Sequence, residues 1–109
     1  EALGKLAEVI KANPSLNVLV EGHTDNVPLS GTGSIKDNWD LSVLRATSIV
    51  RILTWKYSVS PIQVIASGRG EHFPIDTNTT TEGKAKNRRT EIILSPNLDN
   101  LMDILHDNK

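Results

Sequence analysis

The segment from His23 to Arg45 contains the residues whose chemical types could bind a charged ligand. Asp25 offers a carboxylate just after an apolar run, and Arg45 offers a guanidinium in the helix-like segment that follows. A buried or half-buried charge needs a partner. The two side chains could pair with each other. They could also hold a zwitterion, with Asp25 taking its ammonium and Arg45 donating two parallel hydrogen bonds to its carboxylate.

His23 and Asp25 also have the types of two metal ligands. A third ligand is not evident, because His72 and His106 lie in other contexts. We therefore predict no metal and no cofactor. The ordinary alternative is that His23 makes structural hydrogen bonds at a strand end, while Asp25 caps a turn.

The composition argues against several functional classes. The chain has 109 residues, a formal net charge of -1 and no cysteine. A nucleic-acid-binding protein needs a basic face, and thiolate catalysis, disulfides and cysteine zinc sites need cysteine. No serine lies in a G-x-S-x-G pattern, and "GRGEHFP" (68–74) departs from the dinucleotide fingerprint at Phe73. These observations favour binding over catalysis, so we predict that the chain is not an enzyme.

Membrane attachment is expected only through other parts of the protein. No apolar run approaches the roughly 20 residues that span a bilayer, and we find no signal peptide. Because the chain begins at Glu1 and reads as helix by Ala2, we interpret it as a piece of a larger protein. The interpretation includes a further strand before Glu1.

Hydrophobic periodicity predicts alternating helices and strands. The helices are expected at 2–12, about 40–56, about 80–87 and 96–106, and the strands at 16–22, 63–70 and 88–94. A right-handed crossover makes the first two strands parallel. The predicted fold class is therefore α/β, an α+β sandwich in which helices pack on a small mixed β-sheet. We expect a domain over 1–95 and a helical extension over 96–109 that packs on it.

Details of these elements bear on the site. Asn38 or Asp40 is expected to cap the second helix. The apolar stripe of this helix would contain Leu41, Leu44, Ser48, Ile52 and Trp55, widened by Ile49 and Leu53. The loop over 22–37 is longer than a structural connection requires, and such loops are often functional. In an extended strand Arg88 and Arg89 point to opposite faces. We expect one to be solvated and the other to reach a neighbouring element or the loop end that carries Asp25.

Four separated segments together carry a resemblance to a known family. "VEGHTDNVP" (20–28), "NWDLSVLRA" (38–46), "ASGRGEHFP" (66–74) and "GKAKNRRTEI" (83–92) occur in this order. They resemble the OmpA-like domain, a peptidoglycan-binding module shared by OmpA, Pal and MotB, and they look closer to the MotB-type branch. The resemblance covers roughly residues 3 to 94 and implies a β-α-β-α-β topology whose first strand precedes Glu1.

The resemblance implies which residues form the site. Family members hold the diaminopimelate of the peptide stem with the Asp of "HTD" and the Arg of "LSxxRA", which correspond to Asp25 and Arg45. Asn38 would hydrogen-bond the ligand, and Thr24 and Leu41 would border the pocket. Arg88 would support the site, either by touching the ligand or by orienting Asp25, while Asn87 would fix the turn.

The resemblance also implies a function. It is non-catalytic binding of peptidoglycan through meso-diaminopimelate, which would anchor an outer-membrane or envelope protein to the wall. The expected location is the periplasmic face of the envelope, with attachment to the outer or inner membrane through the part before Glu1. The alternative is a protein-interaction or dimerisation module of an envelope or stator-like complex, in which the chain would form a homodimer.

Overall fold

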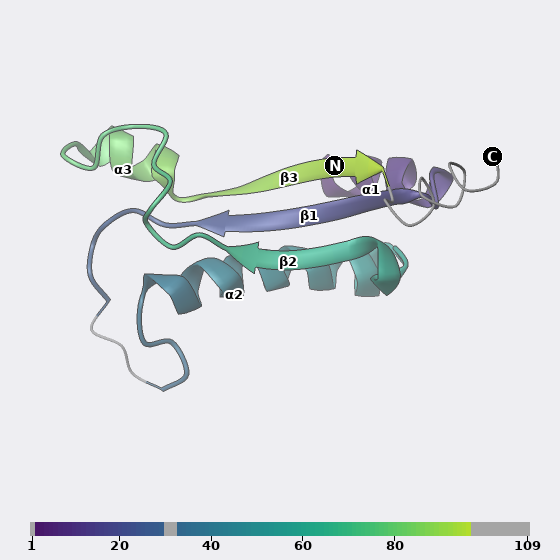
Figure 1. The fold of residues 1–109 in the computed structure, drawn as a ribbon, viewed down its shortest axis with the longest axis horizontal. Coiled ribbons are helices and arrows are strands. Elements are labelled where there is room, and N and C mark those ends of the chain that lie inside the picture. Colours follow the sequence, from purple (N-terminus) through teal and green to yellow (C-terminus); the bar gives the residue numbers. More distant parts are fainter. Residues whose placement is uncertain (1, 30–32, 97–109) are drawn as a thin grey trace, which may run out of the picture.

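The computed structural model describes residues 2–29 and 33–96, in which helices and strands alternate (Figure 1). The helices are α1 (Ala2–Ala12), α2 (Asn38–Arg51) and α3 (Thr81–Asn87), with a π-helical turn η1 (Ile52–Lys56) and a 3-10 turn η2 (Pro61–Gln63). The strands are β1 (Leu16–His23), β2 (Val64–Gly68) and β3 (Arg89–Pro96). Pro96 ends β3 instead of opening a helix, and the rest of the predicted tail helix lies outside the described residues.

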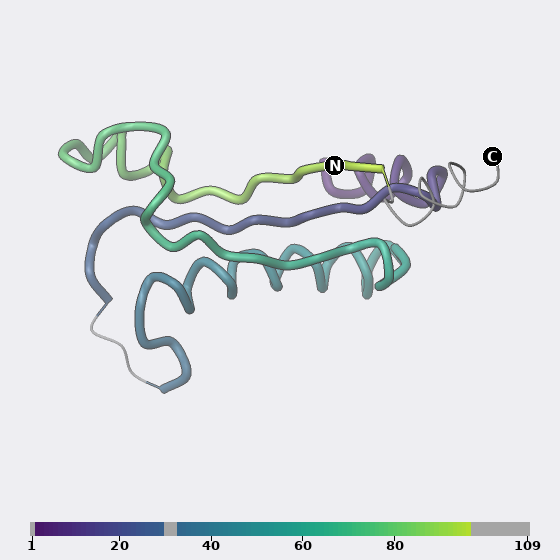
Figure 2. Tube along the Cα trace, in the orientation of Figure 1, coloured from purple at the N-terminus to yellow at the C-terminus, as the bar shows by residue number. Residues whose placement is uncertain are grey.

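The three strands form one mixed sheet in the order β2-β1-β3. β1 runs parallel to β2 with Val20 beside Ala66, and antiparallel to β3 with Val20 beside Ile92. α2 follows β1 and β2 along their length (Figure 2). Residues of α1 and α2 meet Val18 and Val20 in one buried core. The expected α+β class and the parallel pairing are thus confirmed.

The face of α2 that meets the sheet differs from the predicted apolar stripe. Of the predicted stripe, Leu53 is fully buried and Ile49 packs against the core, whereas Leu44, Ile52 and Trp55 are exposed. Ser42 and Ala46, which were not predicted to face the sheet, are fully buried. The reason lies in β1, where a side chain at Gly22 would collide with the backbone carbonyl of Ser42. Such a close approach of strand and helix requires small residues on both elements, so apolar periodicity did not predict Ser42 and Ala46 at this contact.

The first turn of α2 is capped by a residue that the sequence did not single out. Asp37 accepts a hydrogen bond from the Asp40 backbone N–H at 3.0 Å, and the Asp40 carboxylate accepts from the Lys36 N–H at 2.9 Å. The helix is therefore capped by Asp37, and the prediction of Asn38 or Asp40 as the capping residue is wrong. The amide of Asn38 is thereby left for other contacts. Within the described residues, no helix is long and apolar enough to cross a membrane.

Candidate functional site

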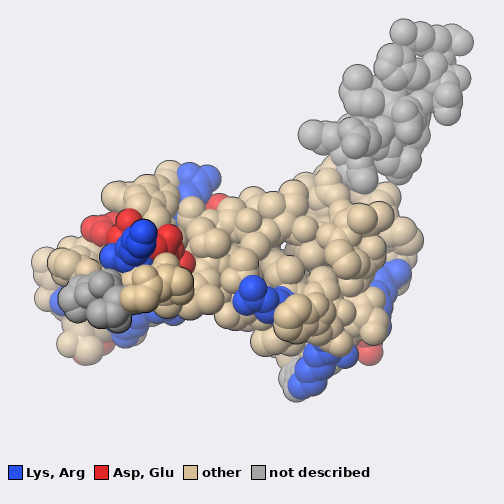
Figure 3. All heavy atoms as spheres, turned by 90° about the horizontal axis from the view of Figure 1, so that it is seen from below, with Lys and Arg blue, Asp and Glu red and all other residues tan. Residues whose placement is uncertain are grey.

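One end of the molecule brings together segments that are far apart in the sequence. The carboxyl ends of β1 and β2, the start of α2 and the turn between α3 and β3 lie there, at the left in Figure 1. The Thr24 N–H donates to the Gly70 carbonyl at 2.9 Å, and the Arg69 N–H donates to the Gly22 carbonyl at 3.0 Å. On the face seen in Figure 3, acidic and basic side chains gather at this same end.

Asn38 fastens the start of α2 to the two neighbouring loops. Its buried side-chain amide donates to the backbone carbonyls of Asp25, at 3.3 Å, and Val27, at 3.1 Å. The same nitrogen lies 3.1 Å from the Glu71 carboxylate. Asn38 therefore fixes the segment that follows Asp25, and its amide nitrogen already has protein partners.

Asp25 is a buried carboxylate held in one orientation. One of its oxygens accepts from the Arg88 guanidinium at 2.7 Å, and the other accepts from the Val27 N–H at 3.0 Å. Burial alone would raise the pKa of Asp25. The hydrogen bonds from Arg88 and Val27, together with the positive charges of Arg88 and Lys84, more than offset this effect and hold the pKa below its ordinary value. Asp25 is therefore ionised at neutral pH, and its charge is paired with that of Arg88.

Arg45 differs from Asp25 because no ion pair joins it to another of the described residues. Its side chain is half-buried, and its Nε atom is buried without a hydrogen-bond partner among the described residues. Arg45 lies seven residues after Asn38 and therefore on the same side of α2. Helical side chains lean towards the helix N-terminus, so we expect its guanidinium to be directed towards the end that carries Asp25. An unpaired buried donor is costly unless a ligand satisfies it.

The remaining expected site residues take different positions. Thr24 is buried, and its hydroxyl donates to the Asp25 carbonyl at 2.8 Å, so its contacts are with the protein. Leu41 is half-buried, one turn before Arg45. Arg88 shows the contact with Asp25 that was one of its two expected roles. Asn87 fixes the neighbouring turn, because its buried side chain bonds the backbone of Ile75 and Asp76.

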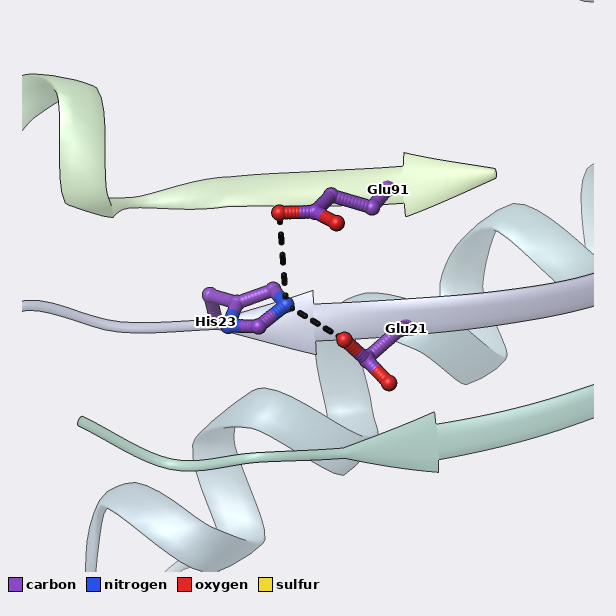
Figure 4. A group of neighbouring side chains, drawn as sticks. All are labelled: Glu21, His23 and Glu91. Atoms are coloured by element: carbon purple, nitrogen blue, oxygen red, sulfur yellow. Dashed lines mark hydrogen bonds and ion pairs between the residues drawn. The ribbon is translucent and has the colours of Figure 1, made fainter. Parts of the chain in front are cut away.

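A second polar cluster, which sequence reasoning missed, lies on the sheet face that points away from α2 (Figure 4). His23 Nε2 is 2.9 Å from Glu21 and 3.7 Å from Glu91. Arg69 pairs with Glu21 at 3.1 Å, and Arg89 pairs with Glu91 at 2.6 Å. A pocket of about 250 Å³ adjoins this cluster, and its lining includes neither Asp25 nor Arg45.

The geometry of this cluster bears on whether its side chains could bind a metal ion. Ligand atoms of Glu21, His23 and Glu91 lie within 4.8 Å of one another. Both carboxylates are already paired with guanidinium groups, so the cluster is neutralised by the protein itself. Burial raises the pKa of Glu21, but Arg69 and His23 outweigh this effect and lower it. His23 and Asp25 engage different partners, so the H-x-D pair does not act as one unit.

The missed cluster had a signal in the sequence. Glu21 and His23 are two apart, as are Arg89 and Glu91, and residues two apart on a strand share a face. Only the antiparallel register, which sets His23 beside Arg89, brings the two pairs together. The Arg89 side chain is only 16% exposed and also donates to the Phe73 carbonyl. Arg89 is therefore not the solvated arginine that we expected at one of the two positions.

Comparison with known proteins connects this geometry to a family. The sequence matches the OmpA family over residues 1–88. It is 35% identical over 92 residues to motility protein B of Bacillus subtilis (strain 168). This match covers 84% of this chain and 35% of that protein. It is 38% identical over 95 residues to the peptidoglycan-binding protein ArfA of Mycobacterium tuberculosis (strain CDC 1551 / Oshkosh), and the match covers 87% of this chain and 27% of the relative.

The solved structures agree with the sequence matches. The C-terminal domain of Helicobacter pylori MotB superposes with a TM-score of 0.78 at 31% identity, covering 98% of this chain and 83% of that structure. The peptidoglycan-associated lipoprotein from Burkholderia pseudomallei superposes with a TM-score of 0.73 at 27% identity, covering 85% of this chain and 74% of that one. The chain spans about a third or less of the length of the two curated relatives.

Proposed function

Because the chain belongs to the OmpA family, we propose that it binds peptidoglycan without cleaving it and anchors its parent protein to the cell wall. A relative named as peptidoglycan-binding and a structure of a peptidoglycan-associated lipoprotein support this proposal. None of the relatives named above is named for a catalytic activity. The single observation that carries the proposal is Arg45, a half-buried cation in α2 whose Nε has no hydrogen-bond partner among the described residues.

The proposed ligand is the free end of meso-diaminopimelate in the peptide stem. That end carries an ammonium and a carboxylate on one carbon. Asp25, fixed by Arg88, accepts from the ammonium, and Arg45 donates to the carboxylate. Leu41 borders the ligand. Thr24 and Asn38 shape the site by holding the backbone around Asp25. No metal or cofactor takes part in this binding.

The proposed location is the periplasmic face of the cell envelope. Several of the similar structures are described as periplasmic domains of MotB, including one with a TM-score of 0.77 at 30% identity that covers 98% of this chain and 69% of that one. Attachment to the outer or inner membrane would come from parts of the parent protein beyond this sequence. In that arrangement the chain forms the wall-binding end of an envelope protein.

A second candidate function, a dimerisation or interaction module, is favoured by one observation. β3 pairs only with β1 among the described residues and therefore forms an edge of the sheet. An edge strand offers unpaired backbone groups to another chain. Removal of the Asp25 carboxylate by Asp25→Ala distinguishes the two functions, because it should abolish wall binding and leave self-association intact.

The proposed function is tested by co-sedimentation with purified cell walls. We expect the chain to pellet with walls that contain diaminopimelate and to stay in the supernatant with walls that contain lysine at the same stem position. Lysine lacks the carboxylate that Arg45 would bind. Equal recovery with both kinds of wall would contradict diaminopimelate recognition, and recovery with neither would contradict wall binding itself.

The Arg88 contact predicts a pH dependence. In Arg88→Gln, burial of Asp25 is less offset, so we expect the pKa of Asp25 to rise and ligand binding to be lost at a higher pH than in the wild type. The lowered pKa of Asp25 also contributes to the stability of the fold. This contribution is fully present at pH values above the ordinary carboxyl pKa of about 3.8, and it is lost as the pH falls through the lowered pKa.

The measurement for this prediction is a carboxyl-carbon NMR titration of Asp25 in the ligand-free protein. Arg89→Gln serves as the matched control, because Arg89 pairs with Glu91 and not with Asp25. An unchanged Asp25 titration in Arg88→Gln, or an equal change in Arg89→Gln, would refute the assigned role of Arg88.

A further inference from the structure

Trp39 is a large aromatic side chain that remains about half exposed, at 51%, beside the proposed binding site. Its ring packs against the His72 ring with centroids 4.8 Å apart. On the same loop, Gly70 has a φ of +60°, and a Cβ at this position would lie 3.4 Å from the Trp39 ring. One side of the indole is therefore supported by protein while the rest is open to solvent.

The backbone connects Trp39 closely to Asp25. Gly70, which lies next to the indole, accepts a hydrogen bond through its carbonyl from the N–H of Thr24, the residue before Asp25. Asn38, the residue before Trp39, bonds the Asp25 carbonyl. Two independent contacts thus place the indole at the end of the molecule where Asp25 lies.

The chemistry of the proposed ligand gives such a surface a use. In peptidoglycan the peptide stem starts on a sugar, a few residues before its diamino acid. An extended chain spans about 3.4 Å per residue, so the sugar lies roughly 10 Å from the diamino acid. A pyranose ring has a face of C–H groups that packs on an aromatic face, while its hydroxyls stay in water, and an indole combines an apolar body with a polar tip.

We propose that Trp39 is a stacking platform for a sugar of the glycan strand, used while Asp25 and Arg45 hold the stem of the same fragment. This inference rests on the proposed function, because it needs the stem to occupy the Asp25 site. It extends recognition from the diamino acid to the carbohydrate. An isolated peptide stem would use only part of the binding surface.

The test compares two ligands that share one stem: a diaminopimelate-containing stem peptide, and the same peptide attached to its disaccharide. We expect wild-type protein to bind the disaccharide form more tightly, by about threefold to tenfold, which is the size of one aromatic contact. Trp39→Ala should remove this difference and leave the affinity for the bare stem unchanged. Trp55→Ala is the matched control, because Trp55, the only other tryptophan, is 79% exposed in η1.

A second measurement leaves Trp39 in place. In Trp55→Phe, Trp39 is the single fluorescent indole, and its emission should shift to shorter wavelength with the disaccharide ligand and not with the bare stem. Equal affinity of the wild type for both ligands, or an unchanged emission, would overturn the platform while the proposed function stood. Binding of neither ligand would overturn both. Normal sugar binding by Trp39→Ala with loss of self-association would assign Trp39 to a protein interface instead.

Discussion

Replacing Arg45 with alanine is expected to abolish cell-wall binding while leaving the free energy of unfolding almost unchanged. The Nε of Arg45 has no hydrogen-bond partner among the described residues, so its removal breaks no hydrogen bond of this atom to them. In the proposed complex, the guanidinium meets a ligand carboxylate. Truncating one member of such a pair costs about 2–5 kcal/mol, so affinity should fall roughly 30-fold or more.

The measurement combines wall co-sedimentation with chemical unfolding. Arg51→Ala is the matched control, because Arg51 lies on the same helix, is exposed and stacks on Trp55 with its guanidinium 5.8 Å from the ring centre. Asp25→Ala provides the contrast, since it leaves the Arg88 guanidinium without its partner and should cost both binding and stability. Full wall binding by Arg45→Ala would show that the unpaired cation is not part of the site.

Gly22→Ala is expected to cause the largest loss of stability of any single methyl group added to β1. The new Cβ would collide with the Ser42 carbonyl and lie 3.3 Å from the Ala46 backbone nitrogen. These are backbone atoms of α2 and cannot rotate away as a side chain could. Overpacking typically costs about 1–3 kcal/mol, and we expect a loss of about 3 kcal/mol or more, a large part of the roughly 5–15 kcal/mol that stabilises a domain.

Chemical denaturation measures this loss directly. The control is Gly4→Ala in α1, where a Cβ would meet only the edge of the Tyr57 side chain at 3.3 Å. Alanine favours helix over glycine by roughly 1 kcal/mol, so this variant should be neutral or slightly more stable. If Gly22→Ala unfolded at the wild-type denaturant concentration, the close contact between β1 and α2 would be wrong.

The sequence predicted where the helices and strands lie better than it predicted which side of each helix is buried. Local signals located β1, α1 and α3, including the Thr80 cap, which accepts from the Gly83 N–H at 3.0 Å. The buried face of α2 was predicted only in part, because the close approach at Gly22 favours Ser42 and Ala46 over larger apolar residues. That requirement comes from a strand distant in sequence, and helical periodicity does not contain it.

The same limit applies to the candidate site. Charge and position alone suggested a basic partner for Asp25, but the local sequence did not decide between Arg45 and Arg88. The structure pairs Asp25 with Arg88, which is 63 residues away. The cluster of Glu21, His23 and Glu91 was missed because it depends on the register of β1 and β3. Contacts set by sheet register are therefore where sequence reasoning fails in this protein.

The most direct test of the central claim is a calorimetric titration with two small ligands. One is meso-diaminopimelate blocked at one amino-acid end, and the other is lysine blocked at its α-amino and α-carboxyl groups. The two differ in the carboxylate that Arg45 is proposed to bind. The proposed function predicts saturable binding of the diaminopimelate ligand and no measurable binding of the lysine ligand. Binding of neither by protein shown to be folded, or equal binding of both, would contradict recognition of the zwitterionic end by Asp25 and Arg45.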